Sequence, residues 1–314
     1  MKASASSIFV RPRLVLLLAS LCCLLWGSAY PAVKTGFVLL SIDRSDLAAQ
    51  LLFAGYRFVA AGFLLLVYAA LSGKDVLQTG RQNLATLLGL GVFQTTLQYL
   101  FFYAGLANTT GVKASILNAV GVFFSVLIAH WVHHDDSINM RKVVGCLLGF
   151  AGVVAANRNS ALGQGGWDFT LNGEGFVVMA ALILSAAGIY GKRVSQRMDT
   201  VVMTGYQLGL GGGVLLTLGA IGGGVLPVFG PAAWALLTYL ALLSATAFAL
   251  WGVLLKYNRV STVSIYSFLV PVFGAALSAL FLGESLLEWK YLLALLLVSA
   301  GIWLVTQEKL SSEP

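Results

Sequence analysis

Charged residues are scarce in this sequence. Only 10% of its 314 residues are Asp, Glu, Lys or Arg, whereas a water-soluble domain carries about 25%. Hydrophobic residues make up 59% of the chain and gather in long runs. This balance excludes a soluble globular domain and predicts an integral membrane protein.

The middle of each long apolar run also lacks acidic residues, since all 12 lie between the runs or at their ends. A proton relay or sodium site inside a membrane usually depends on a carboxylate at that depth. We therefore expect no ion coupling through a buried carboxylate. Neither an Asp pair nor a Ser–His pair occurs within the runs, so an intramembrane protease is excluded and no enzyme is expected.

Cysteine and histidine are few as well. Cys22, Cys23 and Cys146 lie inside apolar runs without metal-ligand spacing, which indicates small buried residues rather than disulfides. The His- and Asp-rich segment 130–136 has two histidines one helical turn apart, a spacing that zinc sites use. We interpret this segment as a solvated turn and predict no metal and no cofactor.

Basic residues outnumber acidic ones, giving a net charge of +7, but they flank the apolar runs instead of forming one cluster. A nucleic-acid-binding surface concentrates its basic residues, whereas charges at run ends are typical of the loops of a polytopic membrane protein. The sequence therefore predicts a lipid bilayer as the surroundings and no nucleic-acid partner.

A bilayer-spanning helix needs about 20 mostly apolar residues. The stretches that meet this requirement are 14–40, 47–71, 82–107, 110–131, 140–157, 174–195, 200–222, 232–256, 260–282 and 287–306. The sequence therefore predicts an all-α integral membrane protein with ten transmembrane helices.

The two sets of five stretches repeat one another. Residues 106–152 align without a gap on residues 255–301 at a shift of 149, and Asp135 falls on Glu284. Farther upstream, Gly55-Tyr56-Arg57 recurs as Gly205-Tyr206-Gln207 at a shift of 150, and Thr95 falls on Ser244. We predict a first five-helix repeat over residues 1–158, a connecting loop over 159–173 and a second repeat over 174–314.

Loop charges predict how the repeats are inserted, because cytoplasmic loops carry an excess of Lys and Arg. With the N-terminus inside, 13 Lys and Arg residues lie in cytoplasmic segments and five lie outside. Both termini are therefore predicted to be cytoplasmic. Since each repeat has an odd number of spans, the second must be inverted, which is the usual plan of secondary transporters that bind substrate between the repeats. We expect a functional monomer.

Polar and aromatic residues at mid-span are the candidates for lining a substrate cavity, because an unpaired polar group in lipid is costly. The predicted lining residues are Trp26, Tyr30, Tyr56, Gln94, Gln98, Tyr99, Asn118, Tyr206, Trp251 and Ser267. The repeat pairs Asn118 with Ser267 and Tyr56 with Tyr206. For each single residue, ordinary helix packing is the alternative.

Three further residues are predicted to act in gating or in structure. Arg57 lies well inside the second span, where it could meet an anionic substrate group or anchor the helix by pairing with helix carbonyls or snorkelling outward. We favour the anchoring role. Pro31 and Pro271 can interrupt their helices and free carbonyl groups beside a cavity, or simply kink them. Val122 stands where the second repeat has Pro271.

Several motifs resemble the drug/metabolite transporter superfamily in its EamA-type ten-helix branch. They are Trp26-Gly27-Ser28 with Pro31, Arg57-Phe58, Pro271-Val272-Phe273, Leu282-Gly283-Glu284 and Gly301. The resemblance covers essentially the whole chain and implies five-plus-five inverted topology and export of small metabolites across the bacterial inner membrane. Within this branch the chain is most similar to the YddG-type exporters, which favour aromatic amino acids. The family carries Arg at the position of Arg57 across differing substrates, which also favours an anchoring role.

The sequence thus predicts a multi-pass inner-membrane carrier that exports amino acids or related small metabolites by alternating access, as a facilitator. The alternative is a proton-coupled exporter of drugs or other metabolites in the same superfamily.

Overall fold

The computed structural model describes residues 9–132, 140–156, 169–258, 263, 265–285 and 288–306. Residues 133–136 of the His- and Asp-rich segment and most of the connecting loop 159–173 lie outside this part of the chain. Throughout the described ranges, the regular secondary structure is helical. The all-helical prediction is therefore confirmed.

The first five predicted spans correspond to helices α1 to α7. Their bounds are α1 Pro12–Leu39, α2 Leu47–Leu71, α3 Val76–Leu90, the π-helix η2 Gly91–Leu97, α4 Gln98–Ala107, α5 Gly111–Asn118, α6 Gly121–Val132 and α7 Met140–Ala156. Helices α3, η2 and α4 follow one another without a gap, so together they form the third span.

The later spans follow the same plan. Their bounds are η3 Leu171–Gly175, α8 Phe176–Ser195, α9 Thr200–Ile221, α10 Pro231–Tyr257, η4 Ile265–Phe268, α12 Leu269–Leu282 and α13 Trp289–Thr306. Among the described residues, seven helical segments are long and apolar enough to cross a membrane, and two shorter apolar helices accompany them. The protein is therefore a multi-pass membrane protein, whereas the number of ten spans stays a prediction.

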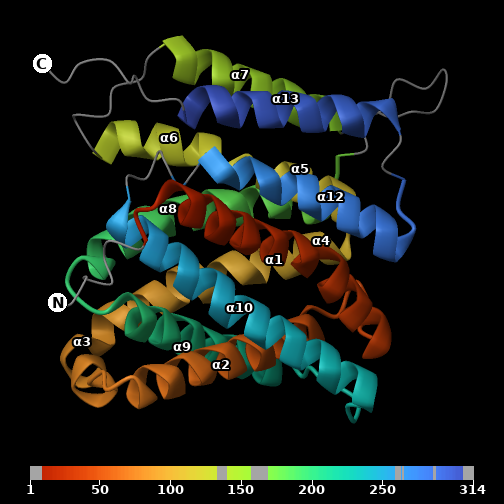
Figure 1. Cartoon of the computed structure of the whole chain (residues 1–314). Helices are drawn as coiled ribbons and strands as arrows, with labels where there is room; N and C mark the ends of the chain where they lie inside the picture. The colour runs from red at the N-terminus through yellow and green to blue at the C-terminus, as the bar shows by residue number, and fades with distance from the viewer. Residues whose placement is uncertain are drawn as a thin grey trace, which may run out of the picture.

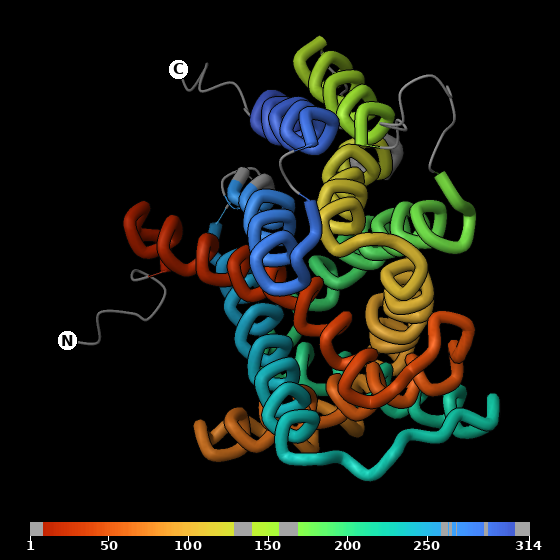
Figure 2. Tube along the Cα trace, turned by 90° about the vertical axis from the view of Figure 1, so that its right-hand side faces the viewer, coloured from red at the N-terminus to blue at the C-terminus, as the bar shows by residue number. Residues whose placement is uncertain are grey.

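The helices are arranged in layers between two pairs of long neighbours. Helices α7 and α13 lie side by side at one edge, and α2 and α9 lie side by side at the opposite edge (Figures 1 and 2). Helix α1 lies between these edges and packs against α10 and α12, while α8 packs against α4 and α6. The interior of the bundle is therefore built around α1 and α8.

Glycines bring α2 and α9 into close contact. A Cβ atom added to Gly62 would collide with the backbone nitrogen of Gly209, and one added to Gly212 would lie 2.7 Å from the nitrogen of Val59. Because lipid gives apolar helices little reason to associate, small residues that permit such backbone approach hold membrane helices together. Glycine also brings α7 and α13 into close contact, since a Cβ on Gly301 would lie 2.6 Å from the carbonyl oxygen of Gly145.

The turns after α2 and α9 share an unusual backbone conformation. Gly73 has a φ of 74° and Gly223 a φ of 76°, and the repeat relates these two positions by a shift of 150. Only glycine adopts such a positive φ at no steric cost. The same reversal of the chain is therefore made at equivalent points of the two repeats.

The fourth and ninth spans are broken at equivalent points. Helix α5 ends at Asn118 and α6 begins at Gly121, while η4 gives way to α12 after Phe268. The shift of 149 places Asn118 on Ser267, so the breaks coincide, although only the second repeat has a proline nearby. Pro31 behaves differently, because α1 continues through it unbroken. The break in the first repeat therefore does not depend on a proline, whereas the break in the second lies just before Pro271.

The packing of α2 on α9 predicts unequal effects for two adjacent glycines. We expect Gly212→Ala to lower the free energy of unfolding by about 1–3 kcal/mol, because its methyl group meets backbone. Gly213 has nothing within 4 Å of an added Cβ, so Gly213→Ala should leave stability unchanged or raise it by up to about 1 kcal/mol. Unfolding titrations in mixed micelles measure both. Equal effects would contradict the contact.

Candidate substrate-binding site

Aromatic rings from α1, α4 and α10 meet in the middle of the bundle. The ring of Trp26 packs edge-on against Phe248 at 5.6 Å and against Trp251 at 5.0 Å between centroids. One turn farther along α1, the ring of Tyr30 packs against Phe102 at 5.6 Å. The structure therefore brings Trp26 and Trp251 into contact and places Tyr30 one helical turn from Trp26 on α1. We call these five rings the aromatic cage.

Three buried polar atoms near this cage have no hydrogen-bond partner. They are the indole Nε1 of Trp26, the Oε1 of Gln98 and the Oδ1 of Asn118. The side chain of Asn118 also interacts with the hydroxyl of Tyr30, and Gln98 lies one helical turn before Phe102. Since nearly all buried polar groups in proteins are paired, this donor and these two acceptors are candidates for contact with a polar ligand.

Tyr99 forms a second aromatic layer behind the cage. Its ring lies 5.7 Å from that of Phe102 and 4.2 Å from that of Phe58 on α2. Tyr99 is only 7% exposed, so it supports the cage from the side of α2. This predicted lining residue therefore lies beside the site, with its ring almost fully covered by neighbouring side chains.

Ser267 and Gln94 flank the centre from two other directions. Ser267 is half-buried in η4, and the neighbouring carbonyl of Tyr266 accepts a hydrogen bond from the Sγ of Cys23 at 3.2 Å, which fixes η4 beside α1. Gln94 lies in η2, and a Cβ added to Gly191 of α8 would lie 3.1 Å from its Oε1. Gln94 therefore faces α8.

Tyr56 and Tyr206 lie away from the cage. Tyr56 is 47% exposed and packs against Phe229 in the segment before α10. The hydroxyl of Tyr206 donates to the carbonyl of Val76 at 3.1 Å, at the beginning of α3. The structure thus assigns both residues to helix packing, which was the alternative for every predicted lining residue.

Arg57 is buried among hydroxyl groups and aromatic rings. It is 1% exposed, its Nε donates to the Oγ of Ser244 at 2.8 Å, and its Nη1 donates to the hydroxyl of Tyr103 at 3.3 Å. Its guanidinium also lies 4.8 Å from the ring centroid of Phe58, a favourable cation–π arrangement. The expected partners, helix carbonyls or outer solvent, were wrong. The side chain instead joins α2 to α4 and α10.

The residue that the repeat relates to Arg57 makes the corresponding contact from the second half to the first. Gln207 of α9 donates through its Nε2 to the Oγ1 of Thr95 in η2 at 3.5 Å. Under the repeat, Gln207 matches Arg57 and Thr95 matches Ser244. Each half therefore extends one side chain from its second span to a hydroxyl on the third span of the other half.

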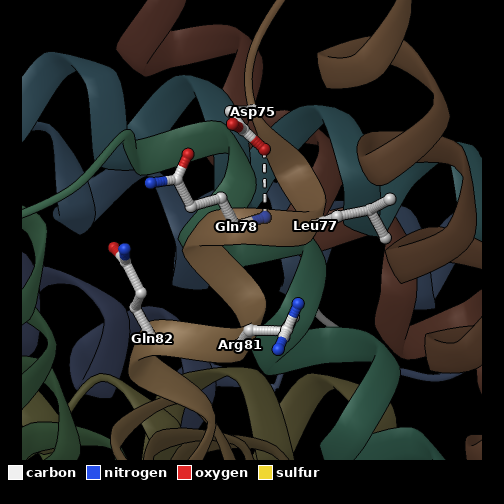
Figure 3. Close-up of a pocket in the computed structure, with 5 residues that line it drawn as sticks. All are labelled: Asp75, Leu77, Gln78, Arg81 and Gln82. Atoms are coloured by element: carbon white, nitrogen blue, oxygen red, sulfur yellow. Dashed lines mark hydrogen bonds between the residues drawn. The ribbon is translucent and has the colours of Figure 1, made fainter.

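A surface hollow of about 540 Å³ lies elsewhere, at the beginning of α3. Its lining residues are Asp75, Leu77, Gln78, Arg81 and Gln82, and the carboxylate of Asp75 accepts from the backbone nitrogen of Gln78 at 3.0 Å (Figure 3). This bond is an ordinary helix N-cap. None of the predicted lining residues belongs to this hollow.

Some residues of the site could not have been singled out from the sequence. Phe248 and Tyr103 are aromatic residues within apolar runs, where periodicity gives no sign of the direction in which they point. No group of three or more His, Cys, Asp or Glu residues gathers in the part of the chain that the structure describes. The side chains that form the aromatic cage and the three unpaired polar atoms beside it are neutral polar and aromatic groups.

The model of the EamA-like transporter family matches residues 13–158 and again residues 171–307. The chain belongs to this family. An "Uncharacterized transporter YvbV" of Bacillus subtilis is 31% identical over 306 residues, covering 94% of this chain and 92% of that one. A "Probable amino-acid metabolite efflux pump" of Salmonella typhimurium is 24% identical and covers 91% and 93%.

Other relatives agree with the family and its location. The "Uncharacterized inner membrane transporter YedA" of Escherichia coli is 26% identical over 302 residues, covering 91% of this chain and 88% of that one. A solved crystal structure with 19% identity has a TM-score of 0.67 and covers 92% of this chain and 95% of that chain, which supports the fold. The expected family and multi-pass membrane location are confirmed.

The Arg57 contacts predict a graded effect of substitution. Arg57→Ala leaves the buried hydroxyls of Ser244 and Tyr103 without their donor, so we expect a loss of about 2–3 kcal/mol in the free energy of unfolding. Arg57→Gln copies the contact that Gln207 makes in the other half and should lose roughly half as much. Unfolding titrations of the two variants measure the difference. Equal losses would contradict a role for these hydrogen bonds.

Proposed function

We propose that this EamA-family protein exports amino acids or related small metabolites across the inner membrane by alternating access. The observation that carries the proposal is the set of unpaired polar atoms on Trp26, Gln98 and Asn118 beside the aromatic cage. Small-molecule sites are mostly apolar surfaces with a few converging polar groups, and this arrangement has that character.

An amino acid carries groups that are complementary to these side chains. Its ammonium group can donate to the amide oxygens of Gln98 and Asn118, and its carboxylate can accept from the indole nitrogen of Trp26. Its side chain can pack against the rings of Trp26 and Trp251, which favours aromatic side chains. Because a zwitterion has no net charge, it needs no opposing charge in the site. The printed name of the Salmonella relative supports the same substrate class.

The proposal includes two inverted halves, residues 1–158 and 174–314, joined by residues 159–173, with both termini cytoplasmic and the monomer as the functional unit. Three observations support the repeat. The positive φ recurs at Gly73 and Gly223, the fourth and ninth spans break at equivalent points, and Arg57 and Gln207 make corresponding contacts. Inverted halves provide two packings of similar energy, which alternating access requires.

We further propose that the carrier is a facilitator. Among the described residues, the site contains no carboxylate or histidine, and the buried Glu174 lies at the beginning of the sixth span, far along the helix from its middle. A proton carried with the substrate would need a titratable group that the substrate also senses. The alternative, proton-coupled export of drugs or other metabolites, would have to use acids at the membrane surface.

Substitutions in the site predict weaker substrate binding. Asn118→Ala removes one acceptor for the ammonium group, worth about 1.5–3 kcal/mol, so KM for a labelled amino acid should rise roughly tenfold or more. Trp251→Ala should have a similar effect through lost ring contact. Tyr56→Ala, which removes an aromatic residue outside the cage, should leave KM unchanged. Uptake into proteoliposomes measures all three. An unchanged KM in both the Asn118 and the Trp251 variant would contradict the proposed site.

The coupling mode has its own test in the same vesicles. A facilitator should equilibrate the labelled amino acid at the same rate with or without an imposed pH gradient. Accumulation against the substrate's gradient that appears only when the pH gradient is imposed would contradict the facilitator and favour the proton-coupled alternative.

A further inference from the structure

Charged side chains from both halves converge on the short connection between α4 and α5. The Nζ of Lys34 on α1 donates to the carbonyl oxygens of Leu106 at 3.3 Å and Thr109 at 2.5 Å. Loop charges assign this end of α1 to the outer face of the membrane. The α4–α5 connection is therefore tied to α1 from within the first half.

Glu174 reaches the same connection from the second half. Its carboxylate accepts from the Oγ1 of Thr109 at 2.6 Å and lies 2.9 Å from the Nζ of Lys113. Glu174 is 3% exposed and Lys113 is 6% exposed. Removing one partner of such a buried ion pair is costly, because the other charge then stays buried without compensation.

Glu284 reaches it from the end of α12. Its two carboxylate oxygens accept from the backbone nitrogens of Gly111 at 2.9 Å and Val112 at 2.8 Å, the first residues of α5. A carboxylate is favoured at a helix N-terminus, where the N–H groups are free and the helix dipole is positive. The two acids of the second half thus bind α5 and the connection before it from two directions.

Small residues bring α5, α12 and α1 into close contact next to these carboxylates. A Cβ added to Gly111 would collide with the Oγ of Ser278 on α12, and one added to Gly274 would lie 2.5 Å from the Cβ of Ser115 on α5. On its other side α12 runs against α1 (Figure 1), where a Cβ on Gly27 would lie 2.8 Å from the nitrogen of Gly274. Helices α1, α5 and α12 are therefore in close contact beside these carboxylates.

The opposite ends of the fourth and ninth spans are arranged differently. Helix α6 packs against α7, α8 and α13, whereas η4 packs against α1, α12 and α13. Alternating access opens one face at a time, so a closed outer face leaves the cytoplasmic face as the route to the site.

We propose that Glu174 and Glu284 are the gating residues of the outer face, which hold the α4–α5 connection shut while the aromatic cage is accessible from the cytoplasm. Release of substrate to the outside then requires both carboxylates to leave Lys113, Thr109 and the beginning of α5. This inference rests on the alternating access of the proposed function. It assigns closure of the outer face to charged groups near the membrane surface, and substrate recognition to the neutral groups in and beside the cage.

The test is the reactivity of a cysteine placed beneath the gate. Ser278 is 0% exposed and its Oγ has no hydrogen-bond partner in the structure, so Ser278→Cys, in a background with Cys22, Cys23 and Cys146 replaced by alanine, is a suitable reporter. The protein is reconstituted in nanodiscs, where both faces are open to reagent, and modified with a charged, water-soluble methanethiosulfonate. Slow modification is expected when the gate is intact.

We expect Glu174→Gln and Glu284→Gln each to speed this modification by about tenfold or more, because each loses charge-assisted hydrogen bonds of the closed state. Asp43→Asn is the matched control. Asp43 is an acid of the same face whose carboxylate bonds only to Ser45 within its own loop among the described residues, so this variant should react like the parent. Unchanged rates in both Glu variants, with melting temperatures near that of the parent, would overturn the proposal.

A milder variant covers the case in which a Glu variant fails to fold. Thr109→Val removes one hydrogen bond to Glu174 and leaves every charge in place, so modification should rise about threefold. A rate equal to that of the parent would overturn the proposal on its own. Because the reporter needs no substrate, these outcomes are separate from the transport assay. If the gate variants react faster and no amino acid is transported, the gate stands and the proposed substrate fails.

Discussion

The backbone contact between α2 and α9 is the constraint on which the rest of the bundle depends. In lipid, helices gain little from burying apolar surface, so the close approach that Gly62, Gly209 and Gly212 permit is what holds this pair together. Once the pair is fixed, Arg57 and Gln207 each reach a hydroxyl on the third span of the opposite half. The contact therefore places α4 and α10 on either side of the interior, and these helices supply rings of the cage.

Charge and recognition are separated in this molecule. The cage and its neighbours Gln98 and Asn118 offer an indole nitrogen and two amide oxygens but no ionised group among the described residues. The buried ion pair of Lys113 and Glu174 lies at one end of the helices instead. A neutral site suits a zwitterion and lets the substrate leave without separating charges. Ionic contacts at the surface can meanwhile set which face is closed. Arg57 belongs to neither group, because its contacts are structural.

Much of the fold could be predicted because it depends on composition and repetition. Apolar runs mark the helices, and the recurrence of Gly55-Tyr56-Arg57 as Gly205-Tyr206-Gln207 singles out α2 and α9, which the structure places side by side. Helix rotation could not be predicted in the same way. Apolar residues cover most of the surface of both helices, so their pattern does not indicate that Tyr56 points outward or that Tyr206 reaches α3.

Local backbone geometry limited the prediction of the site. The third span contains a π-helix, Gly91–Leu97, whose wider turns no apolar periodicity in the sequence indicates. The break after Asn118 occurs without a proline, while Pro31 lies in an unbroken helix. Trp26 and Trp251 were nevertheless expected to face the interior, because polar or aromatic residues far from span ends are costly unless they do so, and the structure places their rings in contact.

The central claim is that two related halves enter the membrane from opposite faces and enclose the site between them. The turns of Gly73 and Gly223 test it directly, because they are equivalent in the repeat and have the same backbone conformation. Ser72→Cys and Val225→Cys, both at exposed positions, can be labelled one at a time in intact cells with a membrane-impermeant thiol reagent, in a background without native cysteines. The account predicts that only the cysteine at position 225 reacts from outside. Reaction of both, or protection of both until the cells are opened, would contradict the inverted halves.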